Sequence, residues 1–297
     1  MATCPGFASR TRPFYRSAPM NPFVETRHII QRELRKNLRS VKGIALAVLT
    51  LLGGSSIALL IAKYNDFKRE EMGQISPEEL HMLREKALAR LYEEDTAKWL
   101  ADAPEVLLAL LSFTVWLAPL LIALMGFDAI SPDIQHRTVR YWTIRSRPWS
   151  YFLGKWAGLW ATVSIVTLAM DAIIWGVCVV RGEADVATTL SWGVRFWLTS
   201  LPLSAIWCSI AVLISSLFRV PMVALLVTFA TFFTLWVVYL IANVAHLDPL
   251  LYLYPNHYDH LMLDPKAYRF GTGVLASFGM TALFVAGGSA LFARRDV

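Results

Sequence analysis

Residues 106–127 read VLLALLSFTVWLAPLLIALMGF and contain no Asp, Glu, Lys or Arg. Charged residues stand immediately on both sides of this run, Glu105 before it and Asp128 after it. About 20 apolar residues in a helix are long enough to cross the roughly 30 Å hydrocarbon core of a bilayer. The run therefore predicts a helix that spans a membrane.

Five further runs have the same character, and only one of them is interrupted by a charge, Asp171. The six predicted spans are residues 43–62, 106–127, 156–180, 196–218, 220–245 and 270–293. Six spans in 297 residues leave no room for a large soluble domain. The sequence thus predicts an all-α polytopic membrane protein in which residues 43–297 form a six-helix transmembrane domain.

The composition supports this class. Apolar residues make up 56% of the chain and charged residues 17%, against about 45–50% and about 25% in an ordinary soluble domain. A disordered chain would be poor in apolar residues and is excluded. A disulfide scaffold is excluded by an odd number of cysteines, and we expect free thiols at Cys4, Cys178 and Cys208.

The basic residues gather on one side of the predicted membrane. If the N-terminus is cytoplasmic, the inner segments carry 17 basic and 5 acidic residues, and the outer segments carry 11 basic and 16 acidic ones. The net charges are +12 inside and −5 outside. Because Lys and Arg favour cytoplasmic loops, we expect both termini inside. With no basic soluble domain, the net charge of +6 does not indicate a nucleic-acid partner.

The N-terminal region has two parts. Residues 1–21 lack the apolar core of a signal peptide and are expected to be disordered. Residues 22–42 predict an amphipathic helix in the membrane surface, with Asn21 as N-cap and Pro22 in the first turn. A solvated helix that packs on a partner is the alternative. The apolar stripe is formed by Phe23, Ile30, Leu34, Leu38 and Val41.

Two loops are predicted on the outer side. Loop 63–105 is acidic and contains a capping box that begins at Ser76, so we expect a helix within it. Loop 246–269 is rich in Pro, Tyr and His. There His257, Asp259 and His260 have a spacing that could hold zinc or copper. The favoured interpretation is a water-facing loop of polar and aromatic side chains without a metal.

The sequence lacks the common catalytic signatures. It contains no phosphate-binding G-x-x-x-x-G-K-[ST] loop, no H-E-x-x-H and no G-x-S-x-G. We therefore expect no catalytic residue and no cofactor in this chain. An intramembrane enzyme that uses Asp171 or the His–Asp–His cluster is kept as an alternative.

Asp171 is the one carboxylate inside a predicted span. Burying it as an anion costs about 3 kcal/mol on insertion scales and more on other estimates. It should therefore meet a Ser, Thr, Trp or basic side chain of a neighbouring span, or water in a cavity. Both a structural hydrogen bond and a proton or cation role remain open.

Small residues recur every fourth position in two spans. Such ridges let helix backbones approach closely, within a subunit or across a dimer. They comprise Gly54, Ala58 and Ala62 in the first span and Ala282, Ala286 and Ala290 in the last.

The inner loop 128–155 carries the most specific pattern. It contains Ile130-Ser131, Asp133 two positions on, Thr138, and Gly154-Lys155 just before the third span. In this order and spacing the chain resembles the permease subunits of ABC-2 (type V exporter-like) ABC transporters. Two residues depart from the family pattern, since Arg137 stands where Gly is usual and Asp133 replaces the commoner Glu.

The resemblance implies a permease subunit in the bacterial cytoplasmic membrane. It implies dimerisation, two copies of a separate cytoplasmic ATPase that supplies ATP and Mg chemistry, and export of a substrate. It also makes residues 22–42 a connecting helix and 128–155 a coupling loop. The alternatives are a permease-fold anchor that powers or places a surface machine without moving a substrate, and a secondary transporter.

The coupling loop is expected to form a short helix over residues 131–143, with Ser131 as N-cap and Pro132 in the first turn. Its arginines would meet acidic residues of the ATPase; alternatively, the basic loop binds anionic lipid heads. The expected coupling residues are Asp128, Ser131, Asp133, Arg137, Thr138, Arg140, Arg145 and Lys155.

Overall fold

The computed structural model describes residues 21–71, 77–138, 141 and 146–294. Almost all of the predicted disordered segment 1–21 therefore lies outside the described residues, as do Arg140 and Arg145. Within the described ranges the chain forms helices and turns but no strand, which confirms the all-α fold. Five of these helices are long and apolar enough to cross a membrane, and the number rises to six if the bent pair Pro22–Arg39 and Val41–Ser56 counts as one span.

Five of the six long helices begin before their predicted apolar runs. The third predicted span begins at residue 156, but its helix begins at Pro148, because backbone hydrogen bonds form whether or not the side chains are apolar. The long helices are α2 (Val41–Glu71), α5 (Glu105–Gly126), α8 (Pro148–Val180), α9 (Val186–Leu217), α10 (Pro221–Ala245) and α13 (Ala267–Ala293). The shorter ones are α1 (Pro22–Arg39), α3 (Pro77–Leu88), α4 (Glu94–Ala101), α6 (Ser131–Gln135), α11 (Asp248–Leu251), η1 (Pro255–Tyr258) and α12 (Asp259–Met262).

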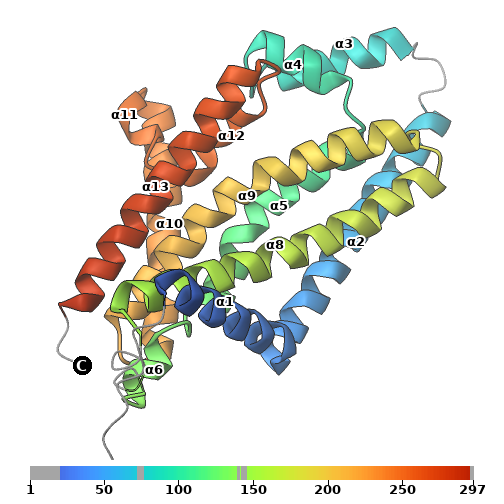
Figure 1. Cartoon of the computed structure of the whole chain (residues 1–297). Helices are drawn as coiled ribbons and strands as arrows, with labels where there is room; N and C mark the ends of the chain where they lie inside the picture. Colours follow the sequence, from blue (N-terminus) through green and yellow to red (C-terminus); the bar gives the residue numbers. More distant parts are fainter. Residues whose placement is uncertain (1–20, 72–76, 139–140, 142–145, 295–297) are drawn as a thin grey trace, which may run out of the picture.

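Helix α9 is the centre of the bundle (Figure 1) and packs against α5, α8, α10 and α13. Its buried surface includes five serines and two alanines, whose small side chains let neighbours come close. A Cβ added at Gly126 of α5 would lie 2.9 Å from the Cβ of Ala211. Cys208 on α9 and Cys178 on α8 are buried free thiols, and Cys4 lies outside the described residues.

The short helices gather at two opposite ends of the bundle (Figure 1). We call the end formed by α1, α6 and the last turn of α13 the basic end. The opposite end, formed by α3, α4, α11, η1 and α12, is the acidic end. Helix α3 lies within the loop where the spacing predicts a helix, although its expected cap, Ser76, is outside the described residues.

Helices α1 and α2 meet at an elbow of 68°. The Ser40 hydroxyl donates to the carbonyl of Asn37 at 3.0 Å and accepts from the backbone N–H of Gly43 at 2.9 Å, so it bridges the two helices. A Cβ at Gly43 would lie 1.7 Å from the Asn37 carbonyl oxygen. Only glycine therefore permits this elbow.

Helix α1 begins as expected, because Asn21 accepts a hydrogen bond from the backbone N–H of Phe23. The residues that α1 buries against α8 are not those of the predicted apolar stripe; they are Glu25, Thr26, Ile29 and Glu33. The stripe itself stays partly or fully exposed, from Phe23 to Val41. This leaves it free to contact lipid while the opposite face packs on protein.

The two small-residue ridges behave differently. Gly54 packs inside the chain, since a Cβ there would lie 2.3 Å from the sulfur of Met170 on α8. By contrast, Ala282, Ala286 and Ala290 are all exposed on α13. The second ridge therefore makes no close helix contact within the described part of the chain, and the side chains of Ala58 and Ala62 in the first ridge lie outside the described ones.

Candidate functional site

A buried cluster of charges at the basic end joins three helices. The Lys155 ammonium on α8 lies 2.9 Å from Oε1 of Glu33 on α1 and 2.8 Å from Oδ2 of Asp133 on α6. The side chains of Lys155 and Glu33 are only 3% and 5% exposed. Buried charges are tolerated when each is paired and hydrogen-bonded. We call Glu33, Asp133, Thr138, Tyr151 and Lys155 the junction.

Asp133 is the most highly connected member of the junction. Its Oδ2 also accepts a hydrogen bond from the Tyr151 hydroxyl, and its Oδ1 accepts one from Thr138 Oγ1 at 3.1 Å. The Thr138 hydroxyl lies 3.2 Å from the Asp133 carbonyl oxygen as well. A carboxylate held by three different side chains is fixed in position, so α6 cannot shift without disturbing Lys155.

Two glycines allow α1 to lie against α8 at the junction. A Cβ at Gly154 would come within 2.6 Å of Ile29, and one at Gly158 within 2.6 Å of the Glu33 Cβ. Gly154 thus lets α1 approach α8 closely, and the adjoining Lys155 supplies the charge that pairs with Glu33. This is a physical reason for the Gly154-Lys155 pair that the sequence singled out.

Helix α6 is also fixed to the end of α9. The buried Ser215 hydroxyl accepts hydrogen bonds from the backbone N–H groups of Ile130 and Ser131, at 3.0 and 3.1 Å. It donates to the carbonyl of Phe127 at 2.8 Å, and the Ser131 hydroxyl donates to the same carbonyl at 2.9 Å. One serine of α9 therefore closes the turn between α5 and α6.

The prediction of one continuous helix over residues 131–143 is wrong in extent and in its cap, because residues 136–138 form a turn; residues 139, 140, 142 and 143 lie outside the described residues. Helix α6 ends at Gln135, and Ser131 is its first residue rather than its N-cap. Arg137 then adopts a left-handed conformation with φ of 56°. A left-handed residue cannot continue a right-handed helix, and glycine adopts this conformation most easily. The family pattern has glycine at this position, and the left-handed backbone of Arg137 is the conformation that glycine adopts most easily.

A second charged contact lies beside the junction. Lys42 of α2 is 2.6 Å from Oδ1 of Asp128 and donates to the carbonyl of Met125 at 3.3 Å. A cavity of about 110 Å³ between the elbow and α8 is lined by both residues and by Glu33 and Lys155. The elbow, α5 and the junction are thus neighbours around one cavity.

The structure brings together several of the expected coupling residues. Asp133, Thr138 and Lys155 belong to the junction, Ser131 is buried beside it, and Asp128 pairs with Lys42. Arg137 is exposed. The sequence interpretation missed three partners of this region, Glu33, Tyr151 and Ser215. Only Glu33 left a signal, as an acid in the middle of a strongly basic helix.

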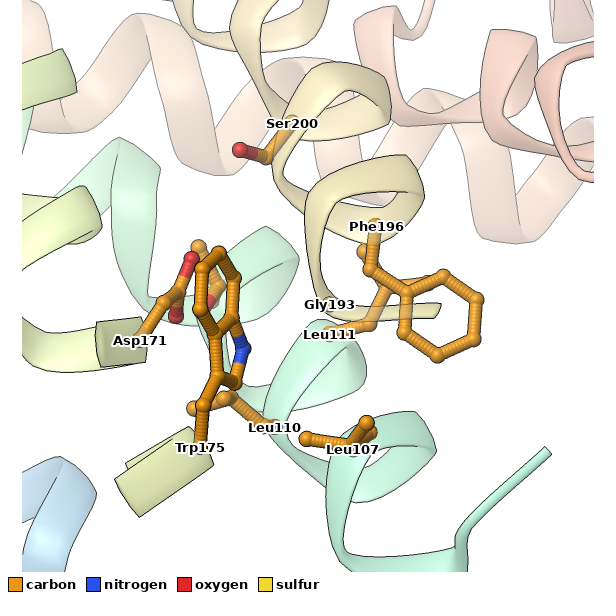
Figure 2. A pocket seen from close by; sticks show the side chains of 9 residues that line it. Leu107, Leu110, Leu111, Asp171, Trp175, Gly193, Phe196 and Ser200 are labelled. Atoms are coloured by element: carbon orange, nitrogen blue, oxygen red, sulfur yellow. The ribbon is translucent and has the colours of Figure 1, made fainter. Parts of the chain in front are cut away.

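Asp171 lies far from the junction, in the interior of α8. It shares a small cavity with Thr114 of α5, Ser200 of α9 and Trp175 of its own helix (Figure 2). The expected types of neighbour are therefore present. Yet Asp171 Oδ1 is buried and has no hydrogen-bond partner in the described part of the chain.

The histidine cluster at the acidic end is surrounded by aromatic side chains. Among the described residues, no group of three or more His, Cys, Asp and Glu side chains could hold a metal ion. His257 and His260 lie among aromatic rings. The ring centroids of Tyr252 and His257 are 5.1 Å apart, and those of Tyr92 and His260 are also 5.1 Å apart. Burial lowers the pKa of both histidines and raises the pKa of Asp259 to about 7.

These features define a polytopic α-helical membrane protein with a basic surface helix and a buried charged junction beneath a short helix. Residues 27–297 match the ABC-2 family transporter protein family, and the chain belongs to that family. Members are transporter membrane subunits that generally dimerise and work with an ABC ATPase. A comparison with curated proteins finds no match to this chain.

Proposed function

We propose that this chain is the permease subunit of an ATP-driven exporter, and that α6 with the loop after it receives the movement of a separate ABC ATPase. The observation that supports this most is the junction. It links the exposed turn at Arg137 to α1 and α8 through Thr138, Asp133, Lys155 and Glu33.

The burial of the coupling residues indicates which of them can contact an ATPase and which hold α6 in place. Ser131 and Lys155 are buried and have no surface to offer an ATPase, so their part is to hold α6 in place. Arg137 is exposed, and the sequence adds Arg140 and Arg145 nearby. In this proposal the arginines make the contact, and the junction transmits the displacement to α1 and α8.

The proposed orientation places the basic end in the cytoplasm, because the segments there carry the charge excess of +12. The setting is a bacterial cytoplasmic membrane with the acidic end outside. Single cysteines at positions 145 and 257 test this with an impermeant thiol reagent in intact cells. Labelling at 257 alone is expected, and labelling at 145 would contradict the orientation.

The decisive test reverses two charges of the loop. Exposed ion pairs are worth only about 0.2–1 kcal/mol each, so a single substitution should have little effect. The double variant Arg137→Glu/Arg140→Glu adds repulsion and should release the ATPase while the permease still inserts. Copurification of the ATPase and vanadate-sensitive ATP hydrolysis are the measurements.

A matched control reverses two charges at the same end but outside the loop. Arg27→Glu/Arg35→Glu changes the exposed side of α1 by the same charge and should keep the ATPase bound. If the loop variant keeps its partner and its activity, the arginines do not contact the ATPase. The arginines would then be assigned to lipid binding rather than to ATPase contact. In that case the loop variant should bind anionic vesicles more weakly than the wild type does.

A further inference from the structure

The cavity at Asp171 is small and mostly apolar, and it lies between α5, α8 and α9. Figure 2 shows Asp171 and Trp175 side by side on α8, facing Leu107, Leu110 and Leu111 of α5 and Phe196 of α9. The cavity has a volume of about 10 Å³, close to what a single water molecule requires. Asp171 is only 5% exposed.

Two buried polar atoms at this cavity lack a partner. Asp171 Oδ1 and Thr114 Oγ1 both have no hydrogen-bond partner among the described residues. Both side chains line the same cavity, and Thr114 is 6% exposed. Buried polar groups are nearly always satisfied in native proteins, so a pair left unsatisfied at one cavity indicates a site that takes up a small polar guest.

A second cavity lies beside the first. It also measures about 10 Å³ and shares Thr114 and Ser200 with the first. Its further polar lining comprises Thr167, Ser204 and Asn256. Asn256 belongs to η1 of the acidic-end loop and holds it in the bundle by accepting from Trp207 Nε1 at 2.9 Å. The two cavities together thus have polar lining residues on α5, α8, α9 and that loop.

We propose that Asp171 is a proton-binding site, occupied in this packed arrangement and emptied when α8 separates from α5 and α9. Ionised, the carboxylate would face mainly apolar side chains, and no basic side chain is among the described residues that line either cavity. Protonated, it is neutral, and its O–H can donate to a water molecule in the cavity. The step is a simple acid–base exchange in which the carboxyl gives its proton to water once the cavity opens.

The surroundings favour a proton over a metal cation. Asp171 is the one titratable side chain among the residues that line the two cavities. Calcium needs six to eight oxygen ligands and magnesium a nearly ideal octahedron, for which one carboxylate and two hydroxyls in 10 Å³ do not suffice. A proton needs only the carboxyl and one water molecule.

The packing around Asp171 explains why helix movement would change its state. A Cβ at Gly193 of α9 would lie 2.4 Å from the Trp175 ring, and one at Gly54 of α2 would lie 2.3 Å from the sulfur of Met170. Both large side chains are close neighbours of Asp171 on α8, so α8 is clamped on both sides of the carboxyl. Sliding α8 against α2 and α9 would loosen both contacts and admit water.

Infrared spectroscopy of the purified full chain tests occupancy directly, because a protonated carboxyl has its own C=O stretching band. Difference spectra at pH 7 between wild type and Asp171→Asn should show the loss of one such band. The control is Asp185→Asn, which alters an exposed carboxylate that caps α9 and should leave the band unchanged. An unchanged band in folded Asp171→Asn would overturn the proposal.

Release of the proton is tested in the complex with the ATPase. This part of the proposal rests on the proposed function. Trapping the complex with vanadate should diminish the Asp171 band relative to the nucleotide-free complex. A band of equal size in both states would overturn release while leaving occupancy intact. If no ATPase associates, the proposed function fails, but the spectra of the isolated chain still decide occupancy.

Discussion

Asp133 and Asp171 are both substantially buried carboxylates, but the molecule surrounds them in opposite ways. Asp133 has an ammonium at 2.8 Å and two hydroxyl donors. Asp171 has mainly apolar neighbours, one oxygen without a hydrogen-bond partner among the described residues, and a cavity the size of one water molecule. The first arrangement fixes a charge in place, and the second leaves the carboxyl free to change its charge. The comparison therefore separates a structural carboxylate from a titrating one.

The largest effect should come from removing the shared cation of the junction. Lys155→Met leaves Glu33 and Asp133 buried without their counter-charge, and breaking such a pair costs about 3–5 kcal/mol. We expect low yield and a much lower Tm in detergent. The control is Lys36→Met, since Lys36 is 52% exposed and 4.0 Å from Glu33. A variant at 155 as stable as the control would contradict the junction.

The same substitution at the two carboxylates tests the comparison itself. Asp133→Asn takes a negative charge from Lys155 and should cost about 1–3 kcal/mol. Asp171→Asn removes no ion pair and should change stability by less than about 1 kcal/mol. Thermal unfolding of both variants in the same detergent gives the two values. Equal losses would show that Asp171 has a partner after all.

An effect of similar size is expected from the close contact between α1 and α8. Gly154→Ala pushes a methyl group against Ile29, and overpacking of this kind costs about 1–3 kcal/mol. Gly176→Ala in the same helix meets nothing within 4 Å and should be neutral or stabilising by up to about 1 kcal/mol. Unfolding temperatures of the pair measure the difference, which vanishes if α1 does not pack on α8.

The smallest effect concerns the turn that brings Thr138 back to Asp133. Arg137→Gly relieves a left-handed residue, a conformation that costs non-glycine residues about 1–2 kcal/mol. Greater chain entropy in the unfolded state offsets about 0.5–1 kcal/mol of this, so a slight rise in Tm is expected. Arg27→Gly in α1 makes the same exchange inside a helix and should lower Tm. A lower Tm in both variants would show that Arg137 does not adopt the left-handed conformation.

Much of the architecture could be predicted without the structure. The six apolar runs identified the long helices, Asn21 and Pro22 located the start of α1, and the inner loop indicated the family. The helix over residues 131–143 failed because residue type says little about where a short helix stops. Its end depends on the Thr138–Asp133 hydrogen bonds and on the left-handed backbone at Arg137.

The sequence by itself determined the class of protein, because the length of an apolar run and the position of its flanking charges are local properties that a bilayer selects. Only the tertiary structure decided which charges are paired. Glu33 and Lys155 are 122 positions apart, and Asp171 shares a cavity with residues of two other helices. Pairing depends on distances of a few ångströms between helices, and a linear pattern of residues does not contain those distances.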